Sequence, residues 1–495
     1  MKNEGLFDLA DSTGANSSEE SLISLCRDSF LSLWSLPNTY TSEGKRAGQS
    51  SGKEFSDVLV VFGGDIILFS DKDIDFNENI GVDIAWGRWF KKAISKSVSQ
   101  LYGARNWAYN FPEEIYLDAK CERPLPVKLP PMDSAKFHLV ATTRGSTGPC
   151  AKAFGSGPGT SILDTSLDLE KNVKTPFRIG LSDRAKPFVH IFDEKTIGLL
   201  LRELDTITDF LRYLRAREAF LSSSSLTVVA FGEEQLLAVY LSQAGIGAAS
   251  FIPSYMRKKK VDVLIYDNTH FQEYVLSDAY RNRKVSERSS YAWDRQIDEF
   301  VKLGNPQYSG YEGIKNSEVE LALRVMASES RFYRRILINQ FNEFHDKAKI
   351  TPGQMSTRMV SAEQRKDIAY IFLLMPCPEA WTREEYRVER AARLRAFCEC
   401  LPLRAPDVKT VIGIGLDHPV RNYLERSEDL LVIIFNDLSK ADFMRLRELA
   451  DKLGIYREGV KYERSREYEY LPFSSVASKV ARNKAKAARR RERKG

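Results

Sequence analysis

The sequence has few of the residues on which zinc hydrolases and disulfide-stabilised proteins depend. Its 495 residues include five histidines, and none is arranged as His-x-His or His-Glu-x-x-His, so the pattern gives little support to zinc hydrolysis. His138 and His190 lie in apolar runs and are interpreted as core or strand-edge side chains. The six cysteines are scattered, which argues against a disulfide framework and favours a reducing, cytoplasmic location.

Long hydrophobic segments are also missing. No run of eighteen apolar residues occurs, so we expect no membrane-spanning helix. The first residues carry no apolar stretch preceded by positive charge, and we therefore expect no secretory signal. The glycine-rich stretch 144–160 lacks a Gly-Lys-[Ser/Thr] sequence. It is interpreted as a linker or a substrate-side loop, not as a phosphate-binding loop.

The most informative segment that is present is a short hairpin. Two apolar runs of strand length, 58–62 and 66–69, flank a Gly-Gly-Asp turn, which suits the positive φ angles of a tight hairpin. Asp57 opens the hairpin, and Asp71 and Lys72 close it. Charges at buried positions are costly unless they pair, bind a metal or take part in chemistry. Carboxylates that hold Mg²⁺ against a phosphate, with a lysine beside them, are typical of a metal-dependent phosphodiesterase.

On these residues, segment 18–145 resembles the PD-(D/E)XK restriction-endonuclease-like superfamily. Asp57 matches the family's first metal-binding acid and Lys72 its lysine. A helix after the hairpin resembles the family's second helix, which often offers a glutamine, here Gln100. The resemblance implies an α/β protein with an N-terminal restriction-endonuclease-like αβββαβ core, whose first helix we expect at 19–34. It also implies Mg²⁺ or Mn²⁺ as the cofactor.

The sequence departs from the family at the second acid. The family places this acid two residues before the lysine, and here that residue is Ser70. Because side chains alternate along a strand, Ser70 and Lys72 share a face while Asp71 points the other way. Three sources of the missing carboxylate stay open: a bulge that turns Asp71 inward, Glu54, or Glu20 in the first helix. A catalytically weakened domain is a further alternative.

Polar and glycine-rich segments separate further α/β regions along the chain. We expect a loop at 39–53, long helices at 196–221 and 317–342, and a helix that begins at the capping box Thr382-x-x-Glu385. The predicted organisation is a disordered N-terminus (1–17), the restriction-endonuclease-like domain (18–145), a Gly/Ser-rich linker (146–174), an α/β middle region (175–345), a small βαββα domain (366–472) and a basic tail (474–495).

The net charge of +6 is concentrated at the C-terminal end. Residues 479–495 hold a net charge of +8, which leaves the other residues at −2. Such a tail suits contact with a phosphate backbone, and it has no apolar face for a membrane surface. A solubility tail without a target is the alternative. The residues predicted to contact nucleic acid are Lys484, Lys486, Arg489, Arg490, Arg491 and Arg493.

We therefore expect a Mg²⁺-dependent nuclease that cleaves DNA or RNA, and the resemblance alone adds a role in prokaryotic genome defence. Two alternatives remain: a non-catalytic nucleic-acid-binding or adaptor protein that keeps the fold, and a structural α/β protein in which a polar loop follows the hairpin. The expected partners are nucleic acid and a protein that binds the C-terminal α/β domain, with no membrane. The predicted catalytic residues are Lys72, Gln100 and Glu20, and the predicted metal ligands are Asp57, Asp71 and Glu54.

Overall fold

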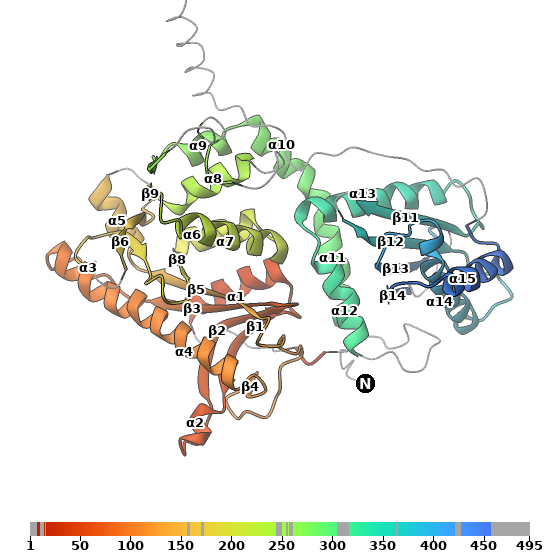
Figure 1. The fold of residues 1–495 in the computed structure, drawn as a ribbon, viewed down its shortest axis with the longest axis horizontal. Coiled ribbons are helices and arrows are strands. Elements are labelled where there is room, and N and C mark those ends of the chain that lie inside the picture. The colour runs from red at the N-terminus through yellow and green to blue at the C-terminus, as the bar shows by residue number, and fades with distance from the viewer. Residues whose placement is uncertain are drawn as a thin grey trace, which may run out of the picture. The chain divides into compact units, whose positions relative to one another are not determined.

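The computed structural model describes residues 7–9, 14, 16–155, 159–169, 173–243, 250–253, 256, 261–303, 316–362, 365–420 and 427–456. They form a mixed α/β protein with two compact units (Figure 1). We call them the N-terminal unit, within Leu9–Glu287, and the C-terminal unit, within Arg288–Glu467. The boundary between the units lies inside the expected middle region 175–345.

The N-terminal unit begins with a helix, a three-stranded meander, a long helical rod and a further strand. Its elements are α1 (Ser17–Phe30), β1 (Ser35–Thr41), α2 (Glu43–Arg46), β2 (Lys53–Phe62), β3 (Asp65–Asp73), α3 (Val82–Phe90), the π-helical turn η1 (Lys91–Ser95), α4 (Lys96–Asn110), β4 (Ile115–Tyr116), β5 (Lys136–Arg144), α5 (Thr147–Phe154), β6 (Ile162–Asp168), β7 (Arg178–Leu181), β8 (Val189–Asp193), α6 (Glu194–Glu203), α7 (Ile207–Leu221), β9 (Thr227–Ala230), α8 (Glu233–Gln243), β10 (Val263–Tyr266), α9 (His270–Val275) and α10 (Asp278–Glu287).

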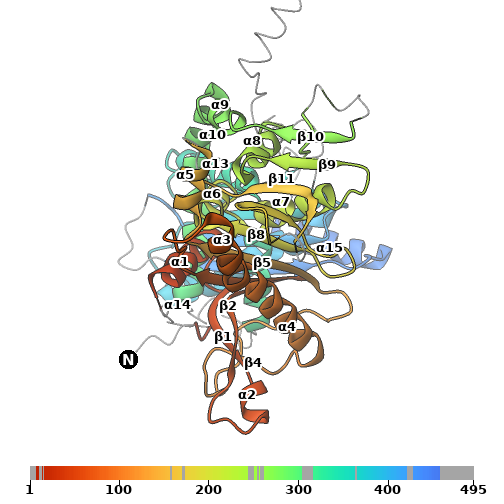
Figure 2. The ribbon, with the colours of Figure 1, turned by 90° about the vertical axis from the view of Figure 1, so that its left-hand side faces the viewer.

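A six-stranded sheet with the order β4-β1-β2-β3-β5-β8 organises this unit. β1, β2 and β3 are antiparallel, whereas β3, β5 and β8 are parallel. α1 and α4 lie on opposite sides of the sheet (Figure 2). Phe69 of β3 stacks on Phe30 of α1 with ring centroids 6.3 Å apart, and the next residue, Ser70, contacts Ser97 of α4 at 3.3 Å. Neighbouring side chains of β3 therefore serve two different layers.

Several local expectations need correction. The expected loop at 39–53 contains the end of β1, α2 and the start of β2, because Tyr40 and Thr41 pair with β2. The expected linker at 146–174 contains α5 and β6. Ile162 and Leu163 are buried in a second sheet with the order β10-β9-β6-β7. Strand pairing thus orders the first segment, and buried apolar side chains draw the second into packed structure.

The helix expected at 196–221 is two helices. α6 ends at Glu203, and α7 begins after Thr206, whose hydroxyl accepts a hydrogen bond from the backbone N–H of Asp209. A threonine that caps an N-terminus in this way satisfies one of the first free N–H groups of the new helix. The apolar stripe continues across the break, so periodicity alone does not reveal it.

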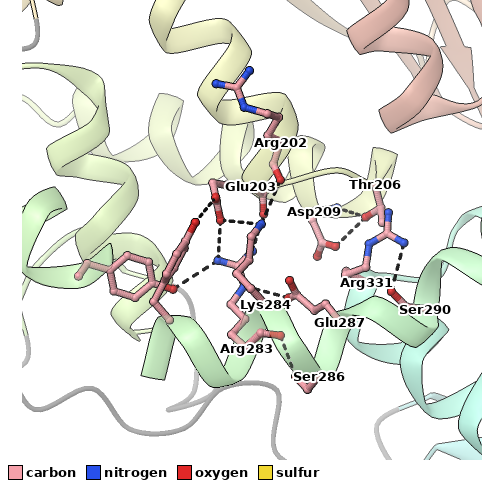
Figure 3. Close-up of polar contacts among 12 residues, drawn as sticks. Arg202, Glu203, Thr206, Asp209, Arg283, Lys284, Ser286, Glu287, Ser290 and Arg331 are labelled. Atoms are coloured by element: carbon pink, nitrogen blue, oxygen red, sulfur yellow. Dashed lines mark hydrogen bonds and ion pairs between the residues drawn. The ribbon is translucent and has the colours of Figure 1, made fainter. Parts of the chain in front are cut away.

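Buried ion pairs attach α10 to the end of α6 (Figure 3). Arg283 is 5% exposed and donates to Glu203 at 3.1 Å and to Glu287 at 2.9 Å. Lys284 lies 3.3 Å from the same Glu203 carboxylate. Because a buried charge is costly unless it is paired, these contacts fix the position of α10 within its unit.

The C-terminal unit contains a four-stranded sheet with the order β11-β12-β13-β14, in which only β12 and β13 are parallel. The capping box of α14 forms as expected, with Thr382 and Glu385 each bonded to the backbone of the other. The helix expected at 317–342 is divided between α12 and α13. The elements are η2 (Arg288–Ser290), α11 (Tyr291–Leu303), α12 (Asn316–Ala327), α13 (Arg331–Ala348), β11 (Ser356–Ala362), β12 (Arg365–Met375), α14 (Arg383–Glu399), η4 (Leu401–Leu403), β13 (Thr410–Asp417), β14 (Glu428–Ile434) and α15 (Lys440–Leu453).

Candidate active site at the fork of the first hairpin

The two strands of the hairpin separate after the pair formed by Val58 and Phe69. Beyond this pair, β2 continues beside β1 and β3 continues beside β5. Strands that separate leave backbone groups without a ladder partner, and buried groups of this kind need another one. The Asp57 carboxylate supplies it by accepting a hydrogen bond from the backbone N–H of Asp71. We call this place the fork.

A β-bulge brings Glu54 to the fork. The pairing of β1 with β2 slips by one residue at Tyr40, which pairs with Glu54 and leaves Phe55 as an extra residue on β2. An extra residue bends the strand and interrupts the alternation of side chains. Glu54 would point away from Asp57 under strict alternation, but its carboxyl group hydrogen bonds with that of Asp57. Of the three sources of a second carboxylate, the structure brings Glu54 to Asp57.

The electrostatic environment of Asp57 is unusual. The residue is only 2% exposed, and burial raises the pKa of its carboxyl group to about 8. The hydrogen bond and negative charge of Glu54 raise this pKa as well, whereas the charge of Lys72 and the N–H of Asp71 lower it. Near neutral pH the carboxyl pair therefore retains a proton, because one lysine does not offset burial and a second acid.

Neutral polar side chains line the neighbouring part of the sheet. The hydroxyl of Ser70 lies 3.3 Å from that of Ser97 and 3.4 Å from Oε1 of Gln100, both on α4. Gln100 thus contacts Ser70, which occupies the position of the second acid in the PD-(D/E)XK pattern that the sequence resembles. The π-helical turn Lys91–Ser95 directly precedes α4, and such turns are frequent at functional sites. Sequence reasoning missed Ser97, although its spacing of three from Gln100 places both on one helix face.

The carboxylate of Asp71 lies outside this cluster, so the structure does not bring it to Asp57 as the predicted metal site would require. Its carboxylate accepts hydrogen bonds from the hydroxyls of Ser18 and Thr142, the latter at 2.5 Å, and Arg144 lies 3.6 Å away. The bulge is in β2, whereas β3 pairs with β5 without interruption through Asp71. Asp71 therefore keeps the alternation of its strand and anchors the start of α1.

The remaining predicted residues do not join the fork. Glu20 is exposed on α1, and within the described part of the chain no hydrogen bond or ion pair links its side chain to Asp57, Glu54 or Lys72. The six basic residues predicted to contact nucleic acid, between 484 and 493, lie outside the described residues.

No protein-family model, curated protein or solved structure matches this chain. Among the residues that the structure describes, no helix is both long and apolar enough to cross a membrane. All six cysteines are free thiols, in agreement with the expected absence of a disulfide framework.

Proposed function

We propose that this protein is a metal-dependent nuclease of the PD-(D/E)XK type that hydrolyses phosphodiester bonds of DNA or RNA. The observation that carries the proposal is the fork, where the buried Asp57 meets Glu54 and the charge of Lys72. The succession of α1, three antiparallel strands, a helical rod and β5 is a supporting feature, since it follows the order of elements in that family. A role in prokaryotic genome defence rests on the resemblance alone.

The carboxylates of Asp57 and Glu54 would hold the cation. Asp57 is buried and Glu54 is exposed, and their hydrogen-bonded carboxyl groups form an oxygen donor set of the kind that Mg²⁺ and Mn²⁺ prefer. When bound, such an ion polarises a phosphoryl oxygen and makes a bound water more acidic. Because the pKa of Asp57 is raised to about 8, its carboxyl group retains a proton near neutral pH, and this proton has to leave before the carboxylate can act as a ligand.

Other residues at the fork would stabilise charge and position the substrate. Lys72 is half-buried beside the acid pair, and its ammonium group would stabilise the negative charge that develops on the phosphate. Gln100 and Ser70 are neutral hydrogen-bonding groups on the same side, suited to positioning a phosphate oxygen or a water. Because Ser70 carries no charge, the site depends on Glu54 for its second carboxylate.

The decisive experiment is incubation of the purified chain with single- and double-stranded DNA and RNA, with EDTA, Mg²⁺ or Mn²⁺. We expect cleavage only with a divalent metal. Glu113→Gln serves as a control, because it removes one exposed negative charge from the same unit at a distance from the fork in sequence. Metal-independent binding without cleavage of any substrate would instead favour the non-catalytic nucleic-acid-binding alternative.

A calorimetric titration tests the cation without relying on activity. Because the pKa of Asp57 is about 8 in the metal-free protein, we expect Mg²⁺ or Mn²⁺ binding at pH about 7 to release close to one proton. The release is measured from the dependence of the binding enthalpy on the ionisation enthalpy of the buffer. Binding of the metal with no proton released would contradict the proposed role of Asp57.

The basic tail is proposed to supply long-range attraction to nucleic acid. Residues 479–495 carry a net charge of +8, against −2 for the other residues, and each phosphate neutralised by Lys or Arg releases counterions. Deletion of 479–495 should lower affinity without changing sequence preference, and should flatten the dependence of log affinity on log salt. An unchanged salt dependence would make the tail a solubility segment.

A further inference from the structure

Three potential metal ligands meet at a second place in the N-terminal unit. His138 on β5, His190 on β8 and Glu218 on α7 each offer one ligand atom, and these atoms all lie within 4.8 Å of one another. The histidines are only 4% and 0% exposed. β5 and β8 are parallel and Val140 pairs with His190, so the histidines lie on one face of adjacent strands, two positions apart in register.

Each imidazole uses one ring nitrogen and leaves the other without a partner. Nε2 of His138 lies 2.9 Å from a carboxylate oxygen of Asp65, and Nδ1 of His190 lies 3.3 Å from Nη1 of Arg217. Nδ1 of His138 and Nε2 of His190 are buried and have no hydrogen-bond partner. Buried polar atoms without partners are uncommon and call for an explanation. The contact of His138 with Asp65 is also typical of metal-binding histidines, in which the ring nitrogen that does not bind the metal donates to a carboxylate.

The charges around this group favour a cation. Arg217 forms two hydrogen bonds to Glu233, at 2.6 and 2.9 Å, and Arg215 forms an ion pair with Asp65. Both arginines are therefore already paired with acids, whereas Glu218 has no arginine or lysine partner among the described residues. Burial and the charge of Arg217 lower the pKa of His190. Its imidazole is consequently neutral, which is the form that binds metals.

We propose that His138, His190 and Glu218 bind a divalent transition-metal ion, for which Zn²⁺ is the best match. Two imidazole nitrogens and one carboxylate form a ligand set that Zn²⁺ accepts, with a water at the fourth position. Mg²⁺ prefers oxygen ligands, so this site would select a different ion from the fork. An ion here would connect β5, β8 and α7, and would thereby stabilise the N-terminal unit.

Binding requires small, definable movements. Zinc ligands lie about 2.0–2.1 Å from the ion, hence about 3.4 Å from one another in a tetrahedral site, so the most widely spaced ligand atoms must approach each other. The half-exposed side chain of Glu218 has the freedom to do so. Arg217 donates to Nδ1 of His190, so the proton of that neutral ring is on Nε2. For Nε2 of His190 to bind the ion, this proton must move to Nδ1. Arg217 must then give up its contact with Nδ1, while it keeps its hydrogen bonds to Glu233.

The test is a zinc titration of the full chain after chelation, followed by calorimetry and thermal unfolding. Asp57→Ala is used as the background, so that the fork cannot contribute. We expect one Zn²⁺ per chain and a higher melting temperature with zinc. Glu218→Gln should weaken binding at least about tenfold, and His138→Gln should abolish it. The matched control Glu113→Gln, which removes a similar exposed charge elsewhere in the unit, should bind zinc normally.

Absence of zinc binding would overturn the proposal, and so would unchanged affinity in Glu218→Gln, because the ion would then be bound elsewhere. Glu218 is half-exposed, so its variant remains informative even if His138→Gln does not fold. The readout is zinc affinity and thermal stability, not cleavage, so either outcome is independent of the proposed nuclease activity.

Discussion

Buried carboxylates occur in both units, and their surroundings differ. In the C-terminal unit, Arg390 is 0% exposed and binds Asp429 at 2.6 Å as well as Asp417. Arg383 binds the same Asp417 at 2.7 Å. Each of these acids therefore faces at least one arginine. At the fork of the N-terminal unit, the charge of the half-buried Lys72 acts on Asp57 against burial and the negative charge of Glu54.

The difference separates a structural network from a candidate site. In the C-terminal network an arginine charge offsets each acid, although burial raises the pKa of Asp429, and Oδ1 of Asp429 and Nη2 of Arg390 have no hydrogen-bond partner among the described residues. A carboxyl group whose pKa is raised to about 8 remains protonated near neutral pH, and it carries an energetic cost that a bound cation would remove. Groups with strongly perturbed pKa values are enriched at functional sites. We therefore propose the fork, rather than the larger charged network, as the place for chemistry.

The largest expected effect is on catalysis at the fork. Asp57→Ala and Lys72→Ala should each lower metal-dependent cleavage by about 10³-fold or more, because several kcal/mol of transition-state stabilisation come from such groups. Initial cleavage rates measured at equal concentrations of folded protein, verified by circular dichroism, check this. Full activity in both variants would contradict the proposal that the fork, in contrast to the Arg390 network, is a catalytic site.

Arg390→Ala tests the structural side of the comparison. Removal of one member of a buried ion network leaves the acids Asp417 and Asp429 uncompensated and should cost on the order of 3–5 kcal/mol in the free energy of unfolding. Arg393→Ala, on the same helix and paired with Glu389 at the surface, should cost less than about 1 kcal/mol. Chemical denaturation of the full chain measures both, and equal losses would contradict the buried role of Arg390.

The pH dependence of stability gives a third test. The native pKa of Asp57 is about 8, above its ordinary value of 3.8, so between these values the unfolded chain loses a proton that the native protein keeps. Stability therefore falls as pH rises through this window and levels off above it. Asp57→Asn should remove a loss on the order of 3 kcal/mol between about pH 5 and pH 8. Thermal unfolding of wild type and variant over this range measures it, and parallel curves would contradict the raised pKa.

The smallest expected effect concerns Asp71, which serves as an anchor. Asp71→Ala should lower the free energy of unfolding by about 1–3 kcal/mol, because the hydroxyls of Ser18 and Thr142 lose a buried acceptor. Cleavage per folded molecule should change far less than in Asp57→Ala. A loss of activity as large as that of Asp57→Ala, with stability unchanged, would return Asp71 to the metal site.

The sequence predicted the structure correctly at the hairpin, at the capping box and in the alternation of β3, where local rules determine the conformation. The hairpin runs 58–62 and 66–69 lie in β2 and β3, and the capping box at Thr382 begins α14. Strand alternation also predicts correctly that Ser70 and Asp71 face opposite layers. Such features depend on residues close in sequence, whose geometry is fixed by backbone sterics and short-range hydrogen bonds.

The interruptions in regular structure were less predictable. The break between α6 and α7 and the strand β1 within a polar stretch depend on packing against other elements. The same is true of the bulge at Phe55, because a bulge exists only in relation to the neighbouring strand. No local sequence pattern predicts where the two strands of a hairpin separate, although that separation determines that Asp57 and Glu54 meet.

The sequence by itself therefore determined the hairpin, its terminal charges and the face on which Ser70 lies. Only the tertiary structure decided that Glu54 meets Asp57, that Asp71 anchors α1, and that His138 and His190 approach Glu218. The physical reason is that residue type and alternation are local, whereas a shared proton or a set of metal ligands requires side chains from separate elements to meet. Their meeting is set by strand register, bulges and helix packing, which depend on the whole unit.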